Sequence, residues 1–282
     1  MKNIILGSAG WREKYAGKID ILSDNEISNF LQEISKRGIN HIDTAPSYGD
    51  AEELIFQFAK PSMMIDTKLD PFKDMQDFER QLNKLKNQRI NIIYFHDPEI
   101  VKNASEDELN QYFKSIQKLN CKMGFSLYEI ENLKLAYSIF ADNEDVVFQV
   151  PVNILDLKFL NFVIKHNIKL DRVIVRSIFS RGLIFQDDAK IPSCFGDKYL
   201  HVKEVFESEY QTSFCQQSLH ELTFSLVSFL NKINIKTLFG VHNIEEVNVI
   251  LENIQKNMQR NFNWDDMIYK SKTISKIEDL IL

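Results

Sequence analysis

The sequence predicts an α/β protein, a closed (β/α)8 or TIM barrel that forms a single domain over residues 1–282. Eight short apolar runs alternate with longer amphipathic stretches, and repeated strand–helix alternation implies parallel pairing through right-handed crossovers. The length of 282 residues also fits, because such a barrel typically needs about 250 residues. No Gly-, Ser- or Pro-rich linker divides the chain. Eight strands favour a closed barrel over an open sheet.

The predicted strands are nearly continuous apolar runs, as expected for strands that are covered on both faces. In chain order they cover residues 4–8, 40–43, 63–68, 91–96, 122–126, 146–150, 172–177 and 236–241.

The predicted helices lie between the strands and carry apolar residues at helical spacing. The first opens at Ser23 and stops before Gly38, two residue types that are typical of helix ends. The helices cover residues 23–36, 74–87, 105–119, 129–140, 156–166, 218–232 and 244–256. Residues 183–216, after strand seven, are longer than a simple crossover and predict an insertion with a loop and an extra helix on the ligand face.

The composition of the chain argues against two classes of binding partner, nucleic acids and membranes. The net charge is only -6, and no basic tract indicates a nucleic-acid partner. No apolar run approaches the roughly 20 residues that span a bilayer, so we expect no membrane association. The three cysteines form no CxxC motif and are expected to be free thiols of a reducing compartment. These features predict a cytoplasmic protein and specify no oligomeric state.

Ionisable side chains stand at three neighbouring strand ends. Asp43 ends the second predicted strand, Lys68 the third and His96 the fourth. Tyr48 follows Asp43 by five residues. Active sites of (β/α)8 barrels lie where strands end and the next loops begin. The four side chains are therefore predicted to converge at one mouth of the barrel.

Six segments, taken together and in order, resemble the aldo-keto reductase family. They are GINHIDTAPSYGDAEELI at residues 38–55, DTKL at 66–69, YFHDP at 94–98, FQVPVNILD at 148–156, VRSIFSRGLIF at 175–185 and LFGVHNIEEV at 238–247. The first is similar to the family signature, in which Tyr-Gly follows an aspartate. The others resemble the lysine and histidine segments and the segments of strands six, seven and eight.

The resemblance implies an NAD(P)H-dependent oxidoreductase that interconverts a carbonyl and an alcohol. The expected partner is a small molecule, namely an aldehyde, a ketone or a sugar-type substrate. Tyr48 is then the general acid, because hydride addition builds negative charge on the carbonyl oxygen and a proton must arrive. Lys68 is expected to lower the pKa of Tyr48 by favouring the phenolate, and Asp43 to pair with Lys68. His96 is expected to orient the carbonyl and to form an oxyanion site with Tyr48.

The resemblance also implies a binding site for NADP(H) or NAD(H). Ser126 and Gln149 are expected near the nicotinamide carboxamide, although Leu127 stands where the family often has asparagine. Arg176, beside Ser177, stands where many members stack an aromatic ring, and a guanidinium is also able to stack. The cofactor contacts expected from strands one and eight are Gly7, Ser8, Gly240, His242 and Asn243.

The choice between the two cofactors depends on the strand-eight segment. Members of the family commonly hold the 2′-phosphate of NADP there with lysine or arginine. Residues 240–251 contain neither, and Glu245 and Glu246 follow closely. This composition weakens the preference for NADP over NAD.

Other interpretations of these residues stay open. Trp11 and Tyr15, just after strand one, are expected to line the substrate pocket, with capping of the barrel as the alternative. One alternative function is a metal-dependent barrel hydrolase that uses His41, Asp43, His96 and Asp97. Such a site needs three or more ligands on converging strand ends. Another alternative is a nucleotide-binding barrel that regulates or binds a partner without turnover.

Overall fold

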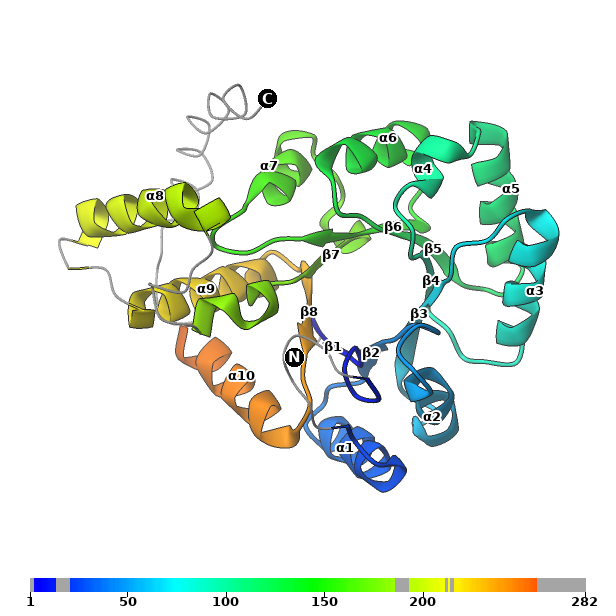
Figure 1. Cartoon of the computed structure of the whole chain (residues 1–282), viewed down its shortest axis with the longest axis horizontal. Helices are drawn as coiled ribbons and strands as arrows, with labels where there is room; N and C mark the ends of the chain where they lie inside the picture. The colour runs from blue at the N-terminus through cyan, green and yellow to red at the C-terminus, as the bar shows by residue number, and fades with distance from the viewer. Residues whose placement is uncertain (1–2, 14–20, 186–192, 211–212, 214–215, 258–282) are drawn as a thin grey trace.

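Eight parallel strands close into a barrel in sequence order, and helices surround it (Figure 1). The computed structural model describes residues 3–13, 21–185, 193–210, 213 and 216–257. The predicted (β/α)8 fold is therefore confirmed.

Each predicted strand is present, and its bounds agree with the prediction to within one residue at each end. The strands are β1 (Ile4–Gly7), β2 (His41–Asp43), β3 (Met64–Leu69), β4 (Ile92–Phe95), β5 (Lys122–Ser126), β6 (Val146–Pro151), β7 (Val173–Arg176) and β8 (Lys236–Gly240). Gly7 is in register with Asp43 on one side and with Gly240 on the other. The ends of β1, β2 and β8 therefore lie at the same rim of the barrel.

The helices follow the strands, as the sequence predicts. They are α1 (Asp24–Lys36), α2 (Ala51–Phe58), α3 (Met75–Leu85), α4 (Ile100–Asn103), α5 (Glu106–Gln117), α6 (Ile130–Phe140), α7 (Lys158–Lys165), α8 (Ser193–Tyr210), α9 (Gln216–Lys232) and α10 (Ile244–Asn257). Two short 3-10 helices, η1 (Leu170–Arg172) and η2 (Ser180–Phe185), flank β7. Helix α8 is the extra helix predicted after strand seven, and it lies outside the ring of barrel helices (Figure 1). In the described part of the chain, no helix is both long and apolar enough to cross a membrane.

The apolar core has two layers. A large outer layer packs the strands against the surrounding helices, and a small inner cluster fills the barrel. The inner cluster consists of Ile5, Ile92, Tyr94, Val147 and Ile174. Because alternate residues of a strand point to opposite faces, this inner set identifies which strand residues face the barrel axis. Asp43, Lys68 and Gln149 belong to the inward-facing set and lie nearer the carboxyl ends of their strands.

Candidate active site

Asp43 and Lys68 form a buried ion pair inside the mouth of the barrel. Lys68 Nζ lies 2.6 Å from Asp43 Oδ1, and the two side chains are 2% and 3% exposed. The same ammonium donates to the main-chain oxygen of Thr44 at 2.8 Å. A buried charge is stable only when it is paired and hydrogen-bonded, so these contacts fix the position of the ammonium. The convergence predicted for Asp43 and Lys68 is present.

Tyr48 lies beside this pair, in the loop between β2 and α2. Lys68 Nζ is 5.1 Å from the centroid of the Tyr48 ring. The sequence predicts that Lys68 lowers the pKa of Tyr48, but the pKa is raised. Burial is the largest cause and outweighs the opposing charge of Lys68, while the charge of Asp43 adds to the rise. Tyr48 is therefore a protonated phenol at neutral pH.

His96 follows β4 and faces Tyr48. The two rings are perpendicular, with centroids 6.2 Å apart. Burial lowers the pKa of His96, and the positive charges of Lys68 and Arg176 act in the same direction. The imidazole is therefore neutral at pH 7, with one nitrogen that donates and one that accepts. The structure thus brings together all four residues predicted at this mouth.

Gln149 and Ser126 lie at neighbouring strand ends, as the sequence predicts, and one of their contacts is unexpected. Gln149 Nε2 donates to Asp43 Oδ2 at 2.9 Å, although the two residues are 106 positions apart. Ser126 Oγ is 3.5 Å from Gln149 Oε1. Both side chains are 1% exposed. Sequence reasoning missed the bond between Gln149 and Asp43, because no local motif reports which residues meet across a barrel interior.

Arg176 reaches across the rim from the end of β7. Its guanidinium donates to the main-chain oxygen of Leu127 at 2.7 Å and to Ser177 Oγ at 3.1 Å. It also stacks on the ring of Tyr128, with Cζ 4.1 Å from the ring centroid. Tyr128 is 46% exposed and was not singled out from the sequence. Arg176 therefore forms a flat, tethered cationic surface beside the predicted carboxamide site.

The loop after β7 has unusual backbone geometry. Ser177 and Ser180 have φ values of 60° and 48°, in the left-handed region that non-glycine residues rarely adopt. Ser180 Oγ is buried and makes no hydrogen bond within the described part of the chain. Strained residues with an unmet polar group often mark ligand contacts. Sequence reasoning did not single out this hydroxyl.

The predicted contacts of strands one and eight lie together at the rim, but several of their polar groups already have partners. Ser8 Oγ donates to Thr44 Oγ1 at 2.8 Å. Asn243 Oδ1 accepts from the main-chain nitrogen of Glu246 at 2.8 Å, and Glu246 Oε2 accepts from that of His242 at 2.9 Å. Glu246 therefore occupies part of the N-terminus of α10. Gly7 and Gly240 are paired where β1 meets β8, and the Leu238 side chain lies close to Gly7.

Trp11 does not line an open pocket, so the expectation for this residue is wrong. The side chain is fully buried, and its indole nitrogen donates to the main-chain oxygen of Val241 at 2.7 Å. Its ring packs edge-on against Phe30 of α1, with centroids 5.3 Å apart. Trp11 thus caps the barrel, which was the alternative interpretation, because a large apolar ring is most stable when fully buried. Tyr15 lies outside the described residues.

The metal-site interpretation gains no support from the geometry. His41 Nε2 lies 2.8 Å from Asp66 Oδ2, in a separate buried pair. Asp97 instead accepts a hydrogen bond from the main-chain nitrogen of Glu99 at 2.9 Å. Among the described residues, no group of three or more His, Cys, Asp and Glu side chains is placed to hold a metal ion.

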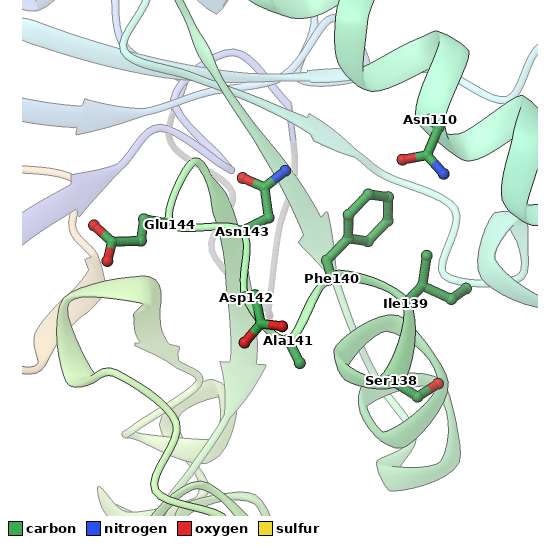
Figure 2. Close-up of a pocket in the computed structure, with 8 residues that line it drawn as sticks. All are labelled: Asn110, Ser138, Ile139, Phe140, Ala141, Asp142, Asn143 and Glu144. Carbon is green, nitrogen blue, oxygen red and sulfur yellow. The ribbon is translucent and has the colours of Figure 1, made fainter.

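A surface pocket of about 430 Å³ lies elsewhere (Figure 2). Its lining comes from Asn110 of α5 and from residues 138–144, which end α6 and lead into the start of β6. None of the residues of the Asp43–Lys68 mouth contributes to it. We therefore place the candidate active site at the strand ends and not in this pocket.

Comparison with protein families matches residues 3–222 to the aldo/keto reductase family. This match covers most of the 282 residues. The chain belongs to the aldo/keto reductase family. It is accordingly an NAD(P)-dependent oxidoreductase, as the resemblance implied.

Solved structures of aldo/keto reductases share the fold. A candidate aldo-keto reductase of Pseudomonas aeruginosa is 16% identical with a TM-score of 0.60, and the match covers 91% of each chain. An aldo/keto reductase of Klebsiella pneumoniae in complex with NADP and acetate is 14% identical with a TM-score of 0.54, covering 96% of this chain and 90% of its own. An aldo-keto reductase from a deep-sea metagenome library of the Medee basin is 16% identical with a TM-score of 0.55, covering 95% and 88%. A search of curated proteins finds no match.

The residues at the rim fit the nicotinamide end of a nicotinamide dinucleotide better than they fit a 2′-phosphate at its other end. Ser126, which approaches Asp43 through Gln149, and Arg176, whose charge acts on the pKa of His96, provide polar groups near Tyr48. At the start of α10, the Glu246 carboxylate lies where a phosphate would otherwise meet main-chain N–H groups. The fit therefore supports a nicotinamide site near Tyr48 and gives less support to a 2′-phosphate site at α10.

Proposed function

We propose that this aldo/keto reductase reduces the carbonyl group of an aldehyde, ketone or sugar-type substrate, with Tyr48 as the proton donor. The observation that carries the proposal is the proximity of the Tyr48 ring to both the Lys68 ammonium and the His96 ring. When bound, NAD(P)H supplies the hydride. The protein residues position the reactants and stabilise the negative charge that develops during the reaction.

Each residue then has a separate role in the proposed reaction. The Tyr48 phenol gives its proton to the carbonyl oxygen as negative charge develops there. Lys68 offsets the charge left on Tyr48, and its own position is fixed by Asp43. Neutral His96 donates a hydrogen bond to the same oxygen and orients the substrate.

The directions of the pKa shifts of Tyr48 and His96 support the roles proposed for these two residues. Because the pKa of Tyr48 is raised above 10.0, the phenol stays protonated over the neutral range and serves as an acid. Because the pKa of His96 is lowered below 6.5, the imidazole adds no second positive charge. The rate of reduction is therefore expected to fall only at alkaline pH, as Tyr48 loses its proton.

Substitution of Tyr48 tests the proposal. Tyr48→Phe removes the proton and keeps the ring, so turnover of 4-nitrobenzaldehyde with NADPH or NADH is expected to fall by at least about 100-fold. Cofactor affinity, measured by quenching of protein fluorescence, should change little. Tyr112→Phe is a matched control, since Tyr112 is buried in the outer core layer away from the mouth. Wild-type turnover in Tyr48→Phe would contradict the assignment.

A further inference from the structure

Gln149 lies where the catalytic pair meets the predicted nicotinamide site. Its amide nitrogen donates to Asp43 Oδ2 at 2.9 Å, and its amide oxygen is 3.5 Å from Ser126 Oγ. A carboxylate only accepts hydrogen bonds, so the amide must turn its nitrogen toward Asp43. Its oxygen then faces Ser126. The orientation of the amide follows from this chemistry.

The contact completes the hydrogen bonding of Asp43. One carboxylate oxygen accepts from Lys68 at 2.6 Å, and the other accepts from Gln149. The Asp43 side chain is 3% exposed, so little water reaches its carboxylate. A buried carboxylate oxygen without a donor is costly, and its ionised form is then less favourable.

We propose that Gln149 is a positioning residue of the catalytic ion pair, which holds the Asp43 carboxylate directed at Lys68. This role differs from that of a cofactor ligand, which the resemblance to aldo-keto reductases implies for Gln149. It rests on the proposed function, because Lys68 matters for turnover only if Tyr48 is the proton donor. The expected consequence is that Gln149 affects the rate of turnover more than cofactor binding.

Gln149→Leu removes both polar atoms at nearly constant volume. We expect at least a tenfold loss of kcat at saturating cofactor, with the cofactor Kd within about threefold of the wild type. A loss of fold would weaken cofactor binding and turnover together, so a fall in kcat at an unchanged cofactor Kd marks a positioning role. Gln117→Leu is the matched control, since Gln117 lies exposed on α5, where it donates to Asp145, and it should keep the wild-type kcat and cofactor Kd.

Gln149→Glu provides a rescue test that does not depend on the leucine variant folding. A protonated glutamic acid at this position donates the same hydrogen bond to Asp43, whereas two ionised carboxylates at this distance repel each other. Activity of Gln149→Glu should therefore approach that of the wild type as the pH falls toward 5 and be lost toward pH 8. Equal loss at all pH values would overturn the inference.

The outcomes separate this inference from the proposed function. A cofactor Kd raised at least tenfold in Gln149→Leu, with wild-type kcat at saturation and a wild-type pH profile, would make Gln149 a cofactor ligand and overturn the inference. If the wild-type protein reduces no carbonyl with either cofactor, the proposed function fails. The cofactor titrations of wild type and Gln149→Leu then still decide whether Gln149 binds cofactor.

Discussion

Glu52 is a buried carboxyl group that the proposed reaction does not use. It lies in the first turn of α2, is 7% exposed, and accepts a hydrogen bond from the Thr67 hydroxyl. Burial raises the pKa of Glu52 to about 7, and the charges of Glu53 and Asp70 add to the rise. The Thr67 bond and the charge of Lys68 act in the opposite direction. Glu52 therefore gains or loses its proton near neutral pH.

This shift predicts a pH-dependent stability. The folded protein binds the Glu52 proton more tightly than the unfolded chain does, where the pKa is 4.5. Its contribution is thus fully present below pH 4.5 and is lost as the pH rises to about 7. Glu52→Gln removes the titration, so at pH 8 the variant should be more stable than the wild type by about 1–3 kcal/mol. At pH 4.5 and below this advantage should vanish.

Urea unfolding at acid and alkaline pH measures this difference. Glu79→Gln is the matched control, since Glu79 carries the same charge and lies exposed on α3. It should keep the wild-type pH dependence. An unchanged pH dependence in Glu52→Gln would show that Glu52 does not titrate near neutrality in the folded protein.

At the scale of elements, β4 and β5 pack closely because Gly124 of β5 has no side chain where the Tyr94 ring of β4 lies. A Cβ atom on Gly124 would lie 2.2 Å from Cδ1 of Tyr94, whose ring is fully buried in the barrel. Gly124→Ala should therefore destabilise the protein by roughly 3 kcal/mol, the upper range for an overpacked core. The free energy of unfolding measures this cost. Gly196→Ala, in α8 with open space around it, should be neutral or stabilising, and equal costs for both variants would contradict the steric argument.

Most elements of the fold were predictable because each has a local signal. Ser23 and Ser105 form capping boxes with the glutamates three residues later, and those helices begin where the sequence predicts. Helix α2 was missed because it spans only eight residues and Asp50 before it makes no side-chain cap. Such a short helix is stabilised by packing against the barrel more than by its own propensity.

The candidate site likewise contains residues that were predictable from the sequence and contacts that were not. Asp43, Lys68 and His96 were predictable, since strand ends of a parallel barrel meet at one rim. The contact of Gln149 with Asp43 and the burial of Trp11 were not, because they depend on which residues meet across the closed barrel. The rise in the pKa of Tyr48 depends on the depth of its burial, which the position of Lys68 in the sequence does not report.

For the molecule as a whole, closure of the barrel places the start of α10 at the same rim as the catalytic pair. Residues 240–251 supply no lysine or arginine there, and the Glu246 carboxylate accepts from the main-chain nitrogen of His242 at 2.9 Å. A 2′-phosphate brought to this helix end would meet that negative charge. A charge-assisted phosphate contact contributes roughly 1.5–3 kcal/mol, so its loss lowers the preference for NADPH by roughly 10- to 100-fold.

We therefore expect weak discrimination between the cofactors, with NADH bound within about tenfold of NADPH. Glu246→Gln should shift the ratio of the two Kd values toward NADPH by roughly fivefold, because about 1 kcal/mol of repulsion is removed. Glu245→Gln is the matched control, as Glu245 is the exposed neighbour with the same charge. Fluorescence titration of wild type and both variants with NADPH and NADH measures the ratios. A thousandfold preference of the wild type for NADPH would mean that the 2′-phosphate binds elsewhere, away from Glu246.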